Sequence, residues 1–179
     1  MELSEVFFNQ FIKDIESGTL KVPRPSIWFL KDEKVRFSMF GWPDPSERRP
    51  TLDAATAVIK RIRPDAYIVL VEGWASRFHD ADDPAKLEEY RRNYKYGDAG
   101  KDPNRTTVLT LLLKNVRTGD VRHAAYEEYP DKVFRPMPEA EGRFESAFSA
   151  LDEARSTMHY DKALRYLRLI EFSAIKIER

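Results

Sequence analysis

The sequence predicts a single α+β domain over residues 1–179, with a largely antiparallel sheet of about five strands and helices packed against it. Three observations predict this class: two pairs of strand-like segments joined by short turns, one continuous apolar strand between the pairs, and helical periodicity at both ends of the chain. Local hairpins dominate and strands do not alternate regularly with helices, so a parallel arrangement is disfavoured. A chain of 179 residues is long enough for one substantial core.

The central strand is predicted at residues 66–77. Its apolar part, residues 67–71, is rich in β-branched and aromatic side chains, too short for a typical helix, and typical of a strand buried on both faces. Alternation along a strand divides the side chains into two sets. One face is predicted to carry Ile68, Leu70, Glu72 and Trp74, and the other Tyr67, Val69 and Val71. Gly73 would mark a bulge or a close approach of another backbone.

Amphipathic helices are predicted before and after this strand. Residues 2–17 carry an apolar stripe of Leu3, Val6, Phe7, Phe11, Ile12 and Ile15, with Phe8 beside it and Gly18 just past the end. Thr51 is a candidate N-cap for a helix from residue 52 to about 63, which Pro64 would end. Residues 144–154 predict a further helix, and Asp161 would cap a last one that continues to Ile170.

Two hairpins complete the predicted sheet. Residues 26–30 and 35–40 flank a short charged turn, and residues 106–116 and 121–129 flank Thr118-Gly119. The second turn would set Lys114 opposite His123. Residues 131–142 are predicted to be a connector, and the tail 171–179 suits either a helix or an edge strand.

Residues 78–105 are predicted to be an insertion, a long polar loop with a short exposed helix that begins at Pro84. Polar connections of this length are uncommon inside compact domains, and they are often functional or mobile.

Composition excludes several classes of function. The chain has no cysteine, which excludes disulfides, thiolate catalysis and cysteine metal sites. Thirty basic residues balance thirty acidic ones, which makes a nucleic-acid partner unlikely on charge alone. We find no signal peptide and no apolar segment of the ~18 residues that a membrane span requires. We therefore expect a cytoplasmic protein without a membrane partner and, in the absence of a glycine-rich phosphate loop, without a cofactor.

Two short motifs carry a resemblance. Val71-Glu72-Gly73-Trp74 ends the central strand, and Asp102-Pro103-Asn104-Arg105 leads into the next strand. These segments resemble a group of small uncharacterised prokaryotic proteins in which the central strand ends Ser-Glu-Ala-Trp and a Pro-x-Arg pattern follows. The chain departs from that pattern at Val71 and Gly73. The resemblance covers about residues 60 to 130 and implies a single α+β domain without assigning an activity.

Residues at the end of the central strand are the candidate ligand site: Glu72, Trp74, Arg77 and His79. The indole of Trp74 would stack on a ligand and the carboxylate of Glu72 would accept hydrogen bonds from it. In the simpler interpretation Trp74 packs at the sheet edge and Glu72 pairs with Arg77 or Arg105.

A metal site is the alternative for the same region, although none is favoured. Glu72, His79, Asp82 and Asp83 offer oxygen and imidazole ligands that suit Mg²⁺, Mn²⁺ or Zn²⁺ in a metal-assisted hydrolase. In the simpler interpretation Asp82 and Asp83 cap the following helix.

Two further patterns concern partners. Arg91 and Arg92 with nearby tyrosines could bind single-stranded nucleic acid, but Glu88 and Glu89 dilute this surface. The C-terminal segment 164–177 is apolar on more than one face, which predicts either deep burial or pairing with a second chain. Because catalytic signatures are missing, we interpret the protein as a non-catalytic binding or interaction module, with a homodimer through this segment as one form.

Overall fold

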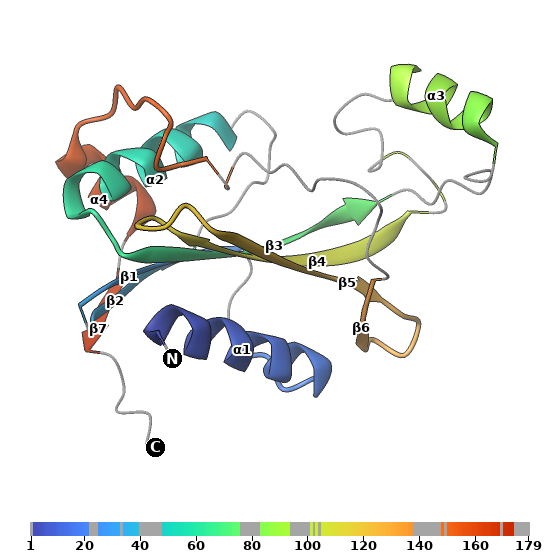
Figure 1. Cartoon of the computed structure of the whole chain (residues 1–179), viewed down its shortest axis with the longest axis horizontal. Coiled ribbons are helices and arrows are strands. Elements are labelled where there is room, and N and C mark those ends of the chain that lie inside the picture. Colours follow the sequence, from blue (N-terminus) through green and yellow to red (C-terminus); the bar gives the residue numbers. More distant parts are fainter. Residues whose placement is uncertain are drawn as a thin grey trace.

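The structure is a computed structural model that describes residues 2–21, 25–32, 34–39, 48–75, 83–93, 101, 103, 105–137, 148, 150–168 and 170–173. The described strands form one sheet in the order β6-β5-β4-β3-β1-β2-β7, and every neighbouring pair is antiparallel (Figure 1). The strands are β1 (Ser26–Lys31), β2 (Lys34–Met39), β3 (Ala66–Ala75), β4 (Thr106–Asn115), β5 (Val121–Glu128), β6 (Phe134–Pro136) and β7 (Ile170–Ser173). The helices are α1 (Leu3–Glu16), α2 (Arg48–Ile62), α3 (Pro84–Asn93) and α4 (Tyr160–Leu167). The α+β prediction is confirmed.

Strand β3 occupies the middle of the seven-stranded sheet, as predicted. It pairs with β1 on one side and β4 on the other. The register with β4 runs without interruption from Ala66 opposite Asn115 to Ala75 opposite Thr106. The predicted bulge at Gly73 is therefore wrong. Among the described residues, none has an atom within 4 Å of where a Cβ at Gly73 would lie, so none of their backbones requires a glycine there either.

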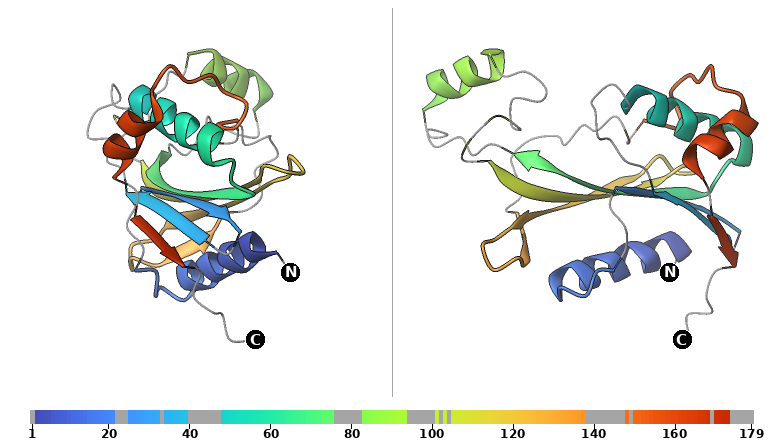
Figure 2. Two further views of the ribbon diagram at one scale, coloured as in Figure 1. Left: turned by 90° about the vertical axis from the view of Figure 1, so that its left-hand side faces the viewer. Right: turned by 180° about the vertical axis from the view of Figure 1, so that it is seen from behind.

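Helices cover both faces of the sheet and create two cores (Figure 2). Tyr67 and Val69 pack with α2 and α4, whereas Ile68 and Leu70 pack with α1. This division matches the two side-chain sets that strand alternation predicts.

Helix α1 ends as predicted but buries a different stripe. Gly18 has a φ of +69°, its N–H bonds the carbonyl of Ile15, and the N–H of Thr19 bonds the carbonyl of Asp14, which together form a Schellman motif. The buried residues are Ser4, Phe8, Phe11 and Ile15. The predicted stripe is wrong at Phe8, which is buried in the core between α1 and the sheet rather than beside the apolar stripe.

Helix α2 begins earlier than predicted, at Arg48. Thr51 is therefore buried inside the helix, and its prediction as an N-cap is wrong. Pro50 is compatible with this start because the first turn of a helix needs no backbone donor at that position. The helix ends at Ile62, just before Pro64, as predicted.

The first hairpin is confirmed, with Lys31 opposite Lys34. The second hairpin forms, but its predicted register is wrong: Leu112, not Lys114, lies opposite His123. The side chain of Asn115 accepts hydrogen bonds from the N–H groups of Arg117 and Thr118, at 3.0 and 3.1 Å, and so builds a longer loop. A shift of two residues leaves each side chain on the same face of the sheet.

The edges of the sheet hold two short strands beyond the five predicted. β6 lies inside the predicted connector and pairs with β5, and β7 pairs with β2. The described part of the tail is thus an edge strand, one of its two predicted forms. Helix α4 begins at Tyr160, which places Asp161 in its first turn rather than at its cap, and ends at Leu167 before β7 starts at Ile170.

Two further predictions concern helices. Residues 148 and 150–154 form turns and a bend rather than the predicted helix, and residues 144–147 and 149 of that prediction lie outside the described residues. Helix α3 is confirmed and lies beyond the end of the sheet where β3 ends and β4 begins (Figure 1). None of the described helices is long and apolar enough to cross a bilayer.

Candidate functional site

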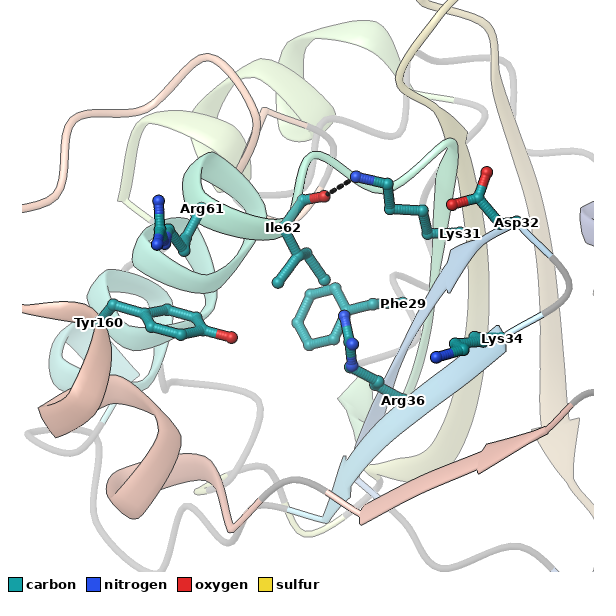
Figure 3. Close-up of a pocket in the computed structure, with 8 residues that line it drawn as sticks. All are labelled: Phe29, Lys31, Asp32, Lys34, Arg36, Arg61, Ile62 and Tyr160. Carbon is teal, nitrogen blue, oxygen red and sulfur yellow. Dashed lines mark hydrogen bonds between the residues drawn. The ribbon is translucent and has the colours of Figure 1, made fainter.

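A pocket of about 430 Å³ lies between the first hairpin and helices α2 and α4 (Figure 3). Its volume falls within the range of small-molecule sites, about 300–1,000 Å³. We call it the hairpin pocket. It is lined by Phe29, Lys31, Asp32, Lys34, Arg36, Arg61, Ile62 and Tyr160.

The pairing of β1 with β2 brings the lining side chains together. Phe29 lies opposite Arg36 and Lys31 lies opposite Lys34, so all four side chains share the sheet face that α2 and α4 cover. Figure 3 shows Arg36 and Lys34 directed into the space in front of Phe29, with the hydroxyl of Tyr160 pointing toward it from the other side. The pocket wall therefore presents polar groups from two separate elements, β2 and α4.

Lys34 and Arg36 have interaction partners of their own, and the other two cations contact the pocket wall. The Nζ of Lys31 donates a 2.6 Å hydrogen bond to the carbonyl oxygen of Ile62, the last residue of α2. A cation is favourable there because the helix C-terminus carries partial negative charge. The guanidinium carbon of Arg61 lies 6.0 Å from the centre of the Tyr160 ring, at the outer limit of a cation–π contact. These contacts fix the shape of the pocket without neutralising its charge.

Among the described residues that line the hairpin pocket, positively charged side chains outnumber negatively charged ones. Four cationic side chains face one lining carboxylate, that of Asp32, which is exposed. The register also places Glu171 of β7 opposite Arg36, although the side chain of Glu171 lies outside the described residues. Excess positive charge in a concave surface raises the local concentration of anions. The arrangement can hold an anion by charge and by hydrogen bonds.

The predicted ligand site lies elsewhere. Glu72 and Trp74 are exposed near the end of β3, and neither lines the hairpin pocket. Trp74 is 60% exposed, and the guanidinium carbon of Arg105 lies 5.1 Å from the centre of its ring. Arg77 and His79 lie outside the described residues, so this site stays a prediction.

Asp83 has a defined structural role. Its Oδ1 accepts hydrogen bonds from the N–H groups of Ala85 and Lys86, at 3.0 and 3.3 Å, and so caps α3. His79 and Asp82, its proposed partners in a metal site, lie outside the described residues. Within the described part of the chain, no three His, Asp or Glu side chains are grouped closely enough to hold a metal ion.

Outside the hairpin pocket, Tyr67 and Lys114 of the sheet contact residues 148, 152 and 153 through polar groups. The hydroxyl of Tyr67 donates to the carbonyl of Phe148 at 2.7 Å and to Oδ1 of Asp152 at 3.1 Å. Burial and the nearby Asp152 charge raise the pKa of the Tyr67 phenol well above its ordinary value, so it stays a donor. Lys114 is only 5% exposed, and its Nζ lies 3.4 Å from Oε1 of Glu153. The cluster fastens this segment to the sheet, and none of its residues lines the hairpin pocket.

His123 lies on β5 opposite Leu112. Partial burial lowers the pKa of its imidazole below the ordinary value, so the ring is mostly neutral at pH 7. The structure places it on the sheet away from the hairpin pocket.

Sequence reasoning missed the hairpin pocket, although β2 carried a signal. The polar residues Lys34, Arg36 and Ser38 alternate along this strand, whereas residues 27–30 of β1 beside it are apolar on both faces. A polar strand face next to a fully apolar strand indicates a place where the helical cover ends. Arg61 and Tyr160 carried no comparable signal, because only the packing of α2 and α4 brings them to the hairpin.

Comparison of the chain with protein-family models, with curated proteins and with solved structures finds no match. The resemblance over about residues 60 to 130 therefore stays a prediction. Any functional conclusion depends on the geometry of the hairpin pocket.

Proposed function

We propose that this protein is a non-catalytic binding module that holds an anionic small molecule in the hairpin pocket. The observation that carries the proposal is the gathering of Lys31, Lys34, Arg36 and Arg61 around one cavity of ligand size. The chain as a whole has no net charge, so this concentration of cations is a local feature rather than a consequence of composition. The cytoplasmic location of the protein stays a prediction.

The chemistry of the wall supports binding rather than catalysis. Lys, Arg and Tyr side chains donate hydrogen bonds, which suits the recognition of an anion. Within the described lining, Asp32 is the one carboxylate, and neither histidine nor serine is present to act as base or nucleophile. Hydrogen bonds to charged groups contribute about 1.5–3 kcal/mol each, so a few of them suffice for measurable affinity.

Calorimetric titration with citrate and with sulfate, at low ionic strength, tests this proposal. We expect saturable binding of one ion per chain that weakens as NaCl is added, because screening reduces the attraction. Replacement of Arg36 by Gln should lower the affinity by at least about tenfold, since a charged hydrogen bond is lost.

The matched control is Arg92→Gln, which removes the same charge from the exposed surface of α3. It should leave the affinity within about twofold of the parent protein, because screening weakens the effect of distant surface charges. Equal affinity in the Arg36→Gln and parent proteins, or heat that never saturates, would contradict the proposal.

The proposal of a homodimer through the C-terminal segment keeps one supporting observation. β7 is an edge strand of the sheet, and such a strand offers unpaired backbone groups on its outer side. The metal-assisted hydrolase and the nucleic-acid accessory protein have no comparable support among the described residues.

A further inference from the structure

Positive charge gathers on the helical layer that covers part of one face of the sheet (Figures 1 and 2). We define this basic layer as residues 49–63, which include most of α2, and residues 155–168, which include α4. The layer holds eight basic residues and two acidic ones, a net charge of +6, whereas the whole chain has no net charge. The eight basic side chains are all exposed: Arg49, Lys60, Arg61, Arg63, Arg155, Lys162, Arg165 and Arg168.

Local ion pairs do not neutralise these charges. In the part of the chain that the structure describes, none of the eight forms an ion pair with a carboxylate. Arg165 donates from Nε to the backbone carbonyl of Asp161 at 3.3 Å, and that acceptor carries no formal charge. Asp53, the other acidic residue of the layer, accepts hydrogen bonds from the N–H and the hydroxyl of Thr157, at 3.1 and 3.4 Å. The basic groups therefore face solvent with their charge available to a partner.

Two contacts show that α4 runs antiparallel to α2. The guanidinium carbon of Arg61, near the end of α2, lies 6.0 Å from the centre of the Tyr160 ring at the start of α4. The hydroxyls of Thr51 and Tyr166, near the opposite ends of the two helices, lie 3.5 Å apart. Basic residues thus lie at both ends of the helix pair and along α4. The distance from Arg49 to Arg61 along α2 is about 18 Å, which an extended peptide of about six residues spans.

We infer that the basic layer is a docking surface for an acidic segment of a partner protein. Six of the eight basic residues are arginines, whose planar guanidinium groups bind carboxylates through two parallel hydrogen bonds. Arginine and tyrosine are enriched at protein interfaces, whereas lysine is depleted there. The inference goes beyond the proposed function, because Arg61 is the one residue of the eight that also lines the hairpin pocket.

Two other polyanionic partners fit the basic layer less well. Single-stranded nucleic acid binds by stacking its bases on open aromatic rings. The ring of Tyr160 already contacts Arg61, and Tyr166, at 38%, is the one large hydrophobic side chain of the layer that is exposed. A membrane surface requires apolar side chains that insert into it, but Val58 and Leu167 of this layer are buried against the sheet. Carboxylates need neither open rings nor apolar anchors.

Fluorescence anisotropy of a labelled octaglutamate peptide, titrated with the full chain, tests the inference. The titration is made in about 0.1 M NaCl, where exposed charges more than about 10 Å apart are largely screened from one another. We expect saturable binding of one peptide per chain that weakens as more NaCl is added. An oligothymidylate with eight phosphates should compete at least threefold less well than unlabelled octaglutamate.

Variants locate the binding surface. Lys162→Glu combined with Arg165→Glu should weaken peptide binding by at least about tenfold, because attraction on the outer side of α4 becomes repulsion. The matched control combines Lys86→Glu with Arg92→Glu on α3, which changes the net charge equally and should leave the affinity within about twofold. Arg36→Gln, in the hairpin pocket, should also leave it within about twofold, which separates this inference from the proposed function.

Several results would overturn the inference. They are absence of saturable binding, equal losses in the two double variants, and an oligothymidylate that competes as well as octaglutamate. A chain that dimerises without peptide, and that the double variant of α4 returns to the monomer, would identify a second copy as the occupant and overturn it too. Arg49→Glu is a second variant that keeps α2 folded, because a carboxylate is favourable in the first turn of a helix, and it should weaken peptide binding about threefold. Unchanged thermal unfolding shows that each variant retains its fold.

Discussion

Replacement of Leu70 by alanine is expected to lower the free energy of unfolding by about 2–5 kcal/mol. Leu70 is fully buried in the middle of β3, where it packs between β1 and β4 and against the α1 side of the sheet. Truncation removes apolar contacts and leaves a cavity that neighbouring strands cannot close, because both are fixed by backbone hydrogen bonds. Denaturant titration followed by circular dichroism measures the loss.

Leu164→Ala is the matched control for this prediction. The same atoms are removed, but Leu164 lies on α4 at the margin of the other core and is only partly buried. We expect Leu164→Ala to lower the free energy of unfolding by less than half as much as Leu70→Ala, because the surroundings of a partly buried site relax more easily. A Leu70 variant as stable as the Leu164 variant would show that β3 is not the centre of the sheet.

A second large effect is expected at Phe8. Phe8→Ala should lower the free energy of unfolding by about 3–5 kcal/mol, the range for truncation of a buried phenylalanine. Phe8 is 1% exposed, and its ring also lies 4.7 Å from the guanidinium carbon of Arg122 on β5. That arginine in turn pairs with Glu5, so the ring helps to hold α1 against the sheet. Thermal and denaturant unfolding measure the effect.

Phe7→Ala is the neighbouring comparison, because Phe7 is only partly buried. We expect Phe7→Ala to lower the free energy of unfolding by less than half as much as Phe8→Ala. The sequence stripe predicted the reverse order, with Phe7 on the buried face and Phe8 beside it. Larger destabilisation by Phe7→Ala would show that α1 packs by the face that periodicity predicted and that its orientation in the structure is wrong.

The predictable parts of the fold are those that local patterns determine. Residues 67–71 form a buried strand because no polar side chain interrupts them, and Gly18 ends α1 because a positive φ suits glycine. The first hairpin followed from a short charged turn between two strand-like segments. In each case the information lies within a few residues of the feature that it specifies.

The failures have other physical causes. The register of β4 with β5 depends on the side chain of Asn115, which caps two backbone N–H groups and lengthens the loop. Strand β6 forms because a three-residue segment of a connector meets the open edge of β5. Neither event changes the hydrophobic pattern from which strands are predicted.

The hairpin pocket could not be derived from the sequence for a related reason. Its cations come from β1, β2 and α2, and its tyrosine lies 129 positions after Lys31 in the chain. Only tertiary packing brings them to one cavity. The predicted site at Glu72 and Trp74 was chosen because those residues adjoin a strand end, which indicates where sites often occur but not what surrounds them.

The most direct measurement of the central claim is a titration of the ¹⁵N-labelled protein with citrate, followed through the backbone amide signals. The claim predicts saturable shifts at residues of the first hairpin, at Arg61 and Ile62, and at Tyr160, with Glu72 and Trp74 unmoved. Shifts that centre on Glu72 and Trp74, or shifts spread evenly over surface lysines and arginines, would contradict it.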